Sequence, residues 1–448
     1  MDKKSAKISV SRQFMHLLHV QVGVLIAPFI FIAALTGLLY ALTPQIEQAI
    51  YQQQLFVEPH AMQSSRPLSE QVMAAQKVLP HDARIFAVRP APTPNSTTRV
   101  LYIDKQHPDI STAIFVNPYN LMIRGQLPVY GTSGVLPIRT FLDNLHRNLL
   151  LGTYGRAYSE LAASWLGVFA ITGLIQWYRK RRQHAQQKTL LKWHSWVGLV
   201  FLPMLLFFSA TGLTWSNWAG ANIAKLRHLA NSDTPSLNTQ LHSMSMNMAN
   251  MDAHAEHHMN MDMSQHMPLQ PRQFDQIMQI ARKQGLNSDY LQIKPSYSPD
   301  KAWTIEEMRH KWPVQIDALA VDMQQQKVVD AIYFKDFPLS AKLTRWGVDA
   351  HIGVLFGWLN QLVLVLSGLG IVILIMIAYG SWLRHAKVKT TLQQSHFLWT
   401  SVWQKATLSQ KTLGCLLVVA LYFLVPVWVI SIFCLQMLCW ASAKNRSS

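Results

Sequence analysis

Long apolar runs alternate with long polar segments along this 448-residue chain. A helix needs about 20 apolar residues to cross a hydrocarbon core roughly 30 Å thick. We therefore predict five membrane-spanning helices, with apolar stretches at Leu17–Leu42, Leu161–Tyr178, Trp196–Trp215, Ile352–Trp382 and Leu413–Trp440. The first stretch is longer than the apolar core of a signal peptide, so we expect it to remain as an anchor.

The two long polar segments, residues 43–145 and 217–350, each show a helical pattern followed by strand patterns. In the first, LSEQVMAAQKVLP has helical spacing, and RVLYID and STAIFVNPYN are typical of strands. In the second, RQFDQIMQIARKQG is helix-like and ends at Gly285, followed by LQIKPSYSPD, WTIEEM and ALAVDMQQQKVVDAIYF as strands and turns. Each segment is therefore predicted to be a separate small α+β domain.

The chain also repeats itself. HVQVGVLIAPFIFIAALTG, from His19, and HSWVGLVFLPMLLFFSATG, from His194, share their histidine, both glycines, the proline and the Thr-Gly ending. A second repeat has an offset of 205 residues and pairs His146, Gly152, Trp177 and Arg179 with His351, Gly357, Trp382 and Arg384. We therefore predict two parallel repeats of helix, outer domain and helix, with the fifth helix appended. In this scheme the second and fourth helices begin at His146 and His351 and cover residues 146–178 and 351–382.

The positions of the basic residues set the expected topology. The net charge is +17, and the segments 1–16, 179–192 and 383–411 hold 4, 6 and 5 Lys or Arg against one acidic residue, Asp2. An excess of Lys and Arg beside membrane spans marks the cytoplasmic side. We therefore expect a cytoplasmic N-terminus with segments 43–145 and 217–350 outside, and interpret the charge as a topology signal rather than a nucleic-acid footprint.

The three cysteines all lie in the last apolar run, at Cys415, Cys434 and Cys439. No disulfide framework is therefore predicted for the outer segments. The chain also lacks a Cys-x-x-Cys-His motif, which argues against covalently attached haem.

The His-x3-Gly helix starts, the Thr-Gly exits, the Leu145-His146 and Ala350-His351 pairs and the strand ending in Asn-Pro-Tyr resemble the PepSY-associated transmembrane family, over about residues 10–390. This family includes bacterial inner-membrane di-haem reductases of ferric siderophores. The resemblance implies an α-helical integral membrane protein of the bacterial inner membrane. Its four-helix core comes from two parallel repeats, and it carries two extracytoplasmic α+β PepSY-like domains.

Four histidines are the candidate cofactor ligands. The predicted topology places His19 and His194 near the inner face, and His146 and His351 at the outer face, which suits two b-type haems with two histidine ligands each. His16 is a rival for His19, but the repeat places Leu191 opposite it. Small residues allow a porphyrin to approach a helix, and the candidates are Gly23, Gly37, Gly198 and Gly212. The alternative is that these histidines only border the membrane.

The outer histidines lie far from the cytoplasmic ends of their helices. A straight helix from His146 to Arg179 would be about 50 Å long, which exceeds the hydrocarbon thickness. We therefore expect either histidines at or above the headgroups or a helix break, for which Gly152-Thr153-Tyr154-Gly155 is a candidate in one half. Five charged residues nearby are candidate partners of haem propionates or imidazoles: Arg147, Arg345, Asp143, Asp349 and Glu160. The alternative is ordinary border charges, which we favour for Glu160 and for the two arginines.

Residues 242–267 form an unusual insert in the second outer segment. It contains 5 His and 8 Met in 26 residues. Thioether and imidazole ligands together favour copper. The candidate ligands are His242, Met244, Met246, Met248, Met251, His254, His257, His258, Met259, Met261, Met263, His266 and Met267. The alternative is a flexible tether.

These patterns predict a transmembrane electron conduit with two b-type haems that reduces a ferric chelate outside. No nucleotide- or flavin-binding motif and no catalytic triad is present in the sequence. Electrons are therefore expected from a cytoplasmic partner or a membrane quinol. Two alternatives remain: a periplasmic copper-handling membrane protein that uses the insert, and a cofactor-free regulator.

Overall fold

The computed structural model of the chain describes residues 14–58, 64–104, 106–131, 133–181, 189–241, 268–384 and 399–444. The chain divides into two units. The helical unit comprises Met1–Ala41, Asp143–Asn231 and Leu362–Ser448, and the sheet unit comprises Leu42–Leu142 and Ser232–Gln361.

The helical unit contains the apolar helices. Its elements are the π-helical turn η1 (Leu17–Gln21), α2 (Val22–Ala41), α7 (Gly152–Lys180), α8 (Thr189–Thr214), α9 (Trp218–Leu229), most of α12 (Trp358–Leu383), α14 (Leu408–Leu424) and α15 (Pro426–Lys444). Among the described residues, four helices are long and apolar enough to cross a membrane: Phe14–Ala41, Gly152–Arg179, Thr189–Thr214 and Trp358–Leu383. They correspond to the first four predicted spans.

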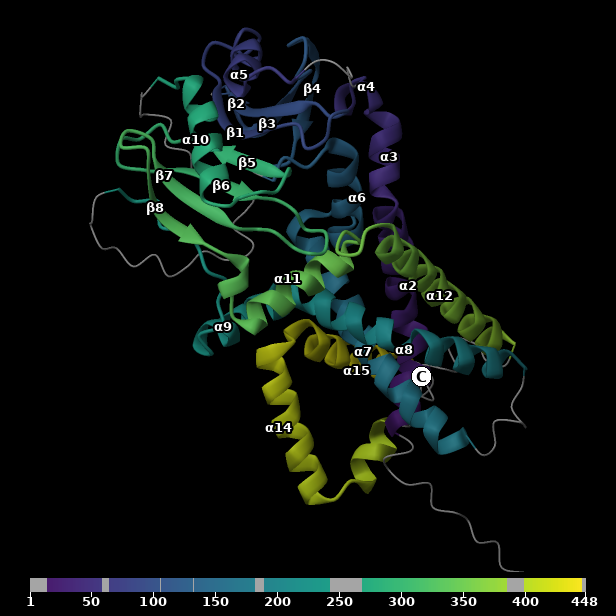
Figure 1. Ribbon diagram of the computed structural model, residues 1–448. Helices are drawn as coiled ribbons and strands as arrows, with labels where there is room; N and C mark the ends of the chain where they lie inside the picture. The colour runs from purple at the N-terminus through teal and green to yellow at the C-terminus, as the bar shows by residue number, and fades with distance from the viewer. Residues whose placement is uncertain are drawn as a thin grey trace, which may run out of the picture. The chain divides into compact units, whose positions relative to one another are not determined.

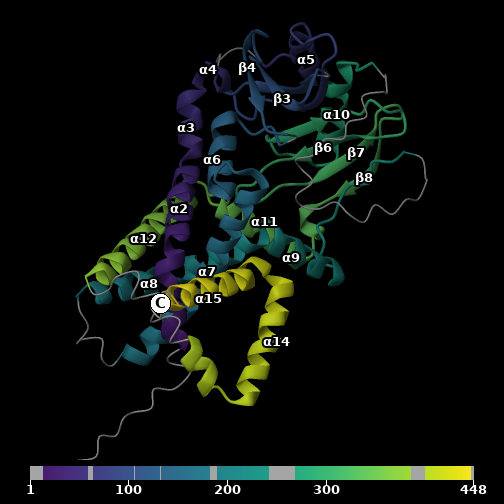
Figure 2. The ribbon, with the colours of Figure 1, turned by 180° about the vertical axis from the view of Figure 1, so that it is seen from behind.

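The fifth predicted span, Leu413–Trp440, is not one helix. It is divided into α14 and α15, which meet at a bend (Figure 2). Val425 leaves the helical conformation with φ −135° and ψ 68°, and Pro426 begins α15. Proline lacks the backbone N–H that would continue the preceding helix, and it disfavours helical backbone at the residue before it. The prediction of a single fifth helix is therefore wrong.

The sheet unit holds all eight named strands in one antiparallel sheet with the order β4-β3-β2-β1-β5-β6-β7-β8 (Figure 1). The strands are β1 (Arg84–Arg89), β2 (Thr98–Asp104), β3 (His107–Val116), β4 (Ile123–Val129), β5 (Leu291–Lys294), β6 (Trp303–Glu307), β7 (Ala318–Asp322) and β8 (Lys327–Ile332). The helices are α3 (Thr43–Ile50), α4 (Gln52–Leu55), α5 (Leu68–Gln76), α10 (Arg272–Lys283), α11 (Leu339–His351) and the first half of α6 (Pro137–Asn148), with the short η4 (Phe334–Asp336).

The sequence predicts two separate α+β domains, but the two polar segments form a single sheet. Strands β1–β4 come from the first segment and β5–β8 from the second, and they join where Val88 pairs with Ile293. Side chains reinforce this seam: Arg89 Nε donates to Gln292 Oε1 at 2.6 Å, and the Tyr297 hydroxyl donates to the Ile85 carbonyl at 3.0 Å. The physical reason is that two isolated domains would each expose an unpaired strand edge.

Helices α5 and α10, one from each segment, share the hydrophobic core on one face of the sheet. Val72 of α5, Phe274 and Ile277 of α10 and Ile293 of β5 are all fully buried in one cluster. The backbone N–H of Ser69, at the start of α5, donates to the Asp275 carboxylate of α10 at 3.2 Å. The helical patterns recognised in the two polar segments are therefore confirmed, but their apolar faces meet in a common core.

His146 and His351 both precede a helix break. His146 lies in the last turn of α6, after which Leu149 and Leu150 have φ values of 53° and 62°. His351 ends α11, and the chain turns before α12 through Gly353 and Gly357, with φ values of 84° and 61°. These left-handed residues stop a helix. A helix break therefore follows each histidine, but in the first half it lies just before Gly152-Thr153-Tyr154-Gly155, which begins α7. The two histidines end preceding helices rather than open the spans at 146 and 351.

Candidate cofactor site

The structure brings His19 and His194 together in the helical unit. His19 lies in η1 and His194 in α8, and their ring centres are 6.2 Å apart with an interplanar angle of 74°. Metal–imidazole bonds are about 2.0–2.1 Å long, so two imidazoles on opposite sides of one metal ion have ring centres roughly 6 Å apart. The spacing fits two axial ligands. A π-helical turn such as η1 is also frequent at functional sites.

Hydrogen bonds at Nδ1 orient both rings. His194 Nδ1 lies 3.2 Å from the Leu374 carbonyl, which only accepts, so Nδ1 carries the proton. His19 Nδ1 lies 3.1 Å from Thr172 Oγ1, whose own proton is donated to the Val168 carbonyl at 2.6 Å. The hydroxyl therefore accepts from His19 Nδ1. Such partners fix the tautomer in which a metal is bound through Nε2.

The glycines of the helical unit differ in how much space an added Cβ atom would have. A Cβ added at Gly173 would lie 2.8 Å from His19 Cε1, so only glycine leaves room for this ring. A Cβ at Gly23 would meet no heavy atom within 4 Å, and one at Gly198 would meet only Leu374 at 3.7 Å. A Cβ at Gly212 would lie 3.0 Å from Ala163. Of these positions Gly23 alone has open space beside it, whereas Gly198 is in ordinary contact with Leu374 and Gly212 serves helix packing.

His146 is held by the same device as His19. Its Nδ1 lies 3.0 Å from Thr36 Oγ1, which donates its own proton to the Ile32 carbonyl at 2.8 Å. A Cβ at Gly37 would lie 3.0 Å from His146 Cε1. Thr36-Gly37 and Thr172-Gly173 are thus equivalent supports. Desolvation lowers the pKa of His146 below its ordinary value, against the opposing charge of Asp143, which favours the neutral imidazole that metals bind.

His351 lies in the sheet unit, next to a buried ion cluster. Asp349 is fully buried, and Arg345 Nε donates to its Oδ2 at 3.1 Å. His310 Nδ1 lies 3.4 Å from Asp349 Oδ1, and His310 also contacts Arg345. His310 was not among the sequence candidates, because a single histidine between β6 and β7 has no spacing signal. Arg345 and Asp349 are thus partners of one another and of His310.

The remaining charged candidates are structural. Arg147 pairs with Asp143 at 3.6 Å and donates to Asn144 at 3.1 Å. Glu160 is fully buried, and its carboxylate accepts from the N–H groups of Trp218 at 3.0 Å and Ala219 at 3.2 Å. The expectation that Glu160 is a solvated border charge is therefore wrong. It neutralises the N-terminus of α9, where anions are favourable.

Not every candidate contributes to a described site. His16 is exposed, whereas His19 faces His194, in agreement with the choice of His19. His146 belongs to the helical unit and His351 to the sheet unit. Thr211, like Thr36, bonds back to its own helix, at the Phe207 carbonyl 2.7 Å away. The His/Met insert 242–267 lies outside the described residues.

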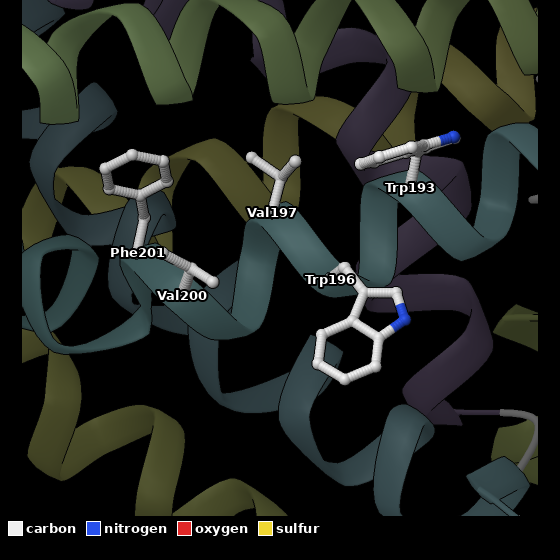
Figure 3. A pocket seen from close by; sticks show the side chains of 5 residues that line it. All are labelled: Trp193, Trp196, Val197, Val200 and Phe201. Carbon is white, nitrogen blue, oxygen red and sulfur yellow. The ribbon is translucent and has the colours of Figure 1, made fainter.

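An apolar pocket lies along α8. It has a volume of about 420 Å³ and is lined by Trp193, Trp196, Val197, Val200 and Phe201 (Figure 3). Trp193 and Trp196 flank His194 in the sequence and are both more than half exposed. All five lining residues belong to α8, so the pocket is an apolar groove on the surface of this one helix.

The chain was compared with known families and proteins. Residues 16–385 match the family described as the PepSY-associated TM region. No curated protein matches the chain. The match includes all four candidate histidines and ends before α14 and α15.

Proposed function

The chain belongs to the PepSY-associated transmembrane family, and from this premise we propose that it is a transmembrane electron conduit with two b-type haems. His19 and His194 are the ligands of the inner haem, and His146 and His351 those of the outer haem. The proposed substrate is a ferric chelate, such as a ferric siderophore, on the periplasmic side of a bacterial inner membrane. Fe(III) is released there on one-electron reduction, because oxygen chelators hold Fe(II) far less tightly.

The observation that carries the proposal is the inner histidine pair. Two imidazoles from different helices lie 6.2 Å apart, and each Nδ1 is bonded to an acceptor. A neutral histidine inside a membrane bundle is costly unless it has such a role or a partner. Haem bound between them would supply reversible one-electron transfer, tuned by its axial ligands and surroundings.

The residues of this chain hold and orient the ligands. Thr172 and Leu374 fix the His19 and His194 tautomers, and Thr36 does the same for His146. Gly173 and Gly37 leave room for the two rings. The rings are thus oriented before any cofactor binds, which reduces the reorganisation that ligand binding requires.

The proposed electron donor is a membrane quinol or a cytoplasmic protein. The apolar pocket on α8 favours the quinol, because its lining is apolar and two of its residues, Trp193 and Trp196, flank His194 in the sequence. The basic segments at 1–16, 179–192 and 383–411 support a cytoplasmic position for this end of the helices.

A second candidate function is copper handling through the insert 242–267, supported by its 5 histidines and 8 methionines. It predicts stoichiometric Cu(I) binding by the full-length protein and loss of that binding when residues 242–267 are deleted. It makes no demand on His19 or His194.

The deciding experiment is the absorption spectrum of the detergent-purified protein, oxidised and then reduced with dithionite, with haem quantified per chain. The conduit requires low-spin haem b at two per chain, and reoxidation of the reduced haems by an added ferric chelate. A colourless protein after expression with ample haem would exclude it. His16→Ala is the matched control for His19→Ala, since His16 is exposed one turn away.

A further inference from the structure

Helix α15 lies outside the family match, which ends at residue 385, yet one of its faces is part of the helical core. Val429, Leu435 and Cys439 are 2%, 7% and 2% exposed. Phe433 and Met437, on the same helix, are 54% and 70% exposed. One face of α15 is therefore buried and another is exposed, although nearly all of its residues are apolar.

The buried face of α15 contacts Trp165 of α7. The Trp428 and Trp165 rings lie 5.6 Å apart, and Trp165 Nε1 donates to Ser431 Oγ at 2.9 Å. Ser431 in turn donates to the Trp428 carbonyl at 2.6 Å. Trp165 is fully buried, so without Ser431 its indole N–H would lose a partner in apolar surroundings, at considerable cost.

From Trp165 the aromatic contacts continue to the inner histidine pair. Trp165 and Phe169 lie 5.4 Å apart on the same helix, and Phe169 lies edge-on to His19 at 6.1 Å. Thr172, which orients His19, follows on α7 one turn later. Four rings, Trp428, Trp165, Phe169 and His19, therefore form a continuous row from α15 to the candidate ligand.

We propose that α15 is a positioning element of the inner site, which sets the orientation and surroundings of His19 through this aromatic row. The inference rests on the proposed binding of haem by His19 and His194. Burial and hydrogen bonding around an axial ligand tune the reduction potential of a haem. Loss of the α15 contacts therefore changes the inner haem and leaves the outer haem as it was.

The test compares Trp428→Ala and Ser431→Ala with Phe433→Ala, a matched change on the exposed face of α15. Optical redox titration and the low-spin haem spectrum are recorded for the two haems of the full-length protein. The first two variants shift one potential and alter one spectrum, and inner-site haem affinity falls roughly three- to tenfold. Phe433→Ala leaves all of these unchanged, and Trp428→Phe, which keeps a ring, restores the wild-type behaviour.

A second readout is independent of haem. Cys439 lies on the buried face of α15, whereas Cys434 is exposed. In membranes, variants retaining only one of these cysteines are labelled with a permeant maleimide. Trp428→Ala accelerates labelling of Cys439 roughly three- to tenfold and leaves Cys434 unchanged.

The outcomes separate the two proposals. A wild-type protein without haem overturns the proposed function, and the positioning role with it, whatever the cysteine labelling shows. A wild-type protein with two haems whose potentials and spectra are the same in Trp428→Ala and Ser431→Ala overturns the positioning role alone. If Trp428→Ala does not fold, Ser431→Ala decides, and an unchanged potential and spectrum in Ser431→Ala then overturn the positioning role.

Discussion

His19 and His146, which belong to the two proposed haem sites, are held by the same pair of residue types on different helices. Thr172-Gly173 of α7 supports His19, and Thr36-Gly37 of α2 supports His146. In each case the threonine accepts from Nδ1 and the glycine leaves space for the ring. The difference is in the second ring: His19 has His194 beside it in the same unit, whereas His351 belongs to the sheet unit.

This comparison shows that ligand orientation is a local property, whereas pairing of ligands depends on the architecture. A Thr-Gly dipeptide on one helix can orient the imidazole of a histidine that lies against it on another helix. The proposed inner pair lies within the helical unit, whereas the proposed outer pair takes one histidine from each unit. The inner site is therefore expected to be less sensitive to changes in the sheet unit.

The largest expected effect comes from removing one proposed ligand of the inner haem or one of the outer haem. His194→Ala and His146→Ala should each lower the haem content from two per chain to one, because a haem with one axial ligand is weakly held. Haem per chain and redox titration identify which haem is lost. Loss of the same haem in both variants would contradict the assignment of two sites.

The next effect comes from the threonines. Thr172→Val removes the acceptor of His19 Nδ1, and Thr36→Val that of His146 Nδ1, with little change in size. Partners of metal-bound histidines contribute about 10- to 100-fold to affinity. Haem affinity should fall by that factor at one site in each variant, and Thr→Ser at the same position should restore it. An equal loss of haem affinity at both sites in either variant would show that each threonine does not act only on its own histidine.

An effect of similar size is expected from the glycines. Gly173→Ala places a Cβ 2.8 Å from His19 Cε1, and Gly37→Ala places one 3.0 Å from His146 Cε1. Overpacking costs about 1–3 kcal/mol, so the affinity of the corresponding site should fall, more at Gly173 than at Gly37. Gly380→Ala is the control, since nothing lies within 4 Å of the added atom. A change at Gly380 as large as that at Gly173 would exclude a steric cause.

The smallest expected effect is on the free energy of unfolding rather than on haem binding at either proposed site. Glu160→Gln weakens the cap of α9, which is expected to cost about 0.5–2 kcal/mol. Thermal unfolding in detergent measures it. Glu70→Gln, in a partly exposed pair with Arg66 at 3.8 Å, should cost less than that. Loss of haem in Glu160→Gln at normal stability would assign Glu160 to a site instead.

The repeat offset selects His19 over His16, and His19 is the one that lies beside His194 in the structure. It does not predict Thr172, which has no counterpart in the repeat and is recognisable only when α7 lies beside η1. The break at Pro426 had a signal, a proline within an apolar run, whereas the burial of Glu160 had none. Whether a charged side chain near a membrane border is buried or exposed depends on which backbone N–H groups lie next to it in the folded chain.

The helices and most strands of the sheet unit also follow from periodicity, but their assembly into one sheet does not. Hydrophobic alternation predicts that a strand has a buried face, but it does not predict which other strand lies next to it in the sheet. The pairing of β1 with β5 joins residues 205 positions apart, Val88 and Ile293. No local pattern records a contact of that range.

That seam has a consequence for how the chain is made. Strand β4 ends at Val129 and β5 begins at Leu291, so during synthesis the first half-sheet is complete long before the partner of β1 exists. For that interval β1 is an open edge, and open edges invite pairing with other nascent chains. Its sequence, RIFAVR, begins and ends with arginine. Charge at both ends of the strand protects the edge until β5 arrives, and replacing Arg84 and Arg89 together should appear first as aggregation during expression.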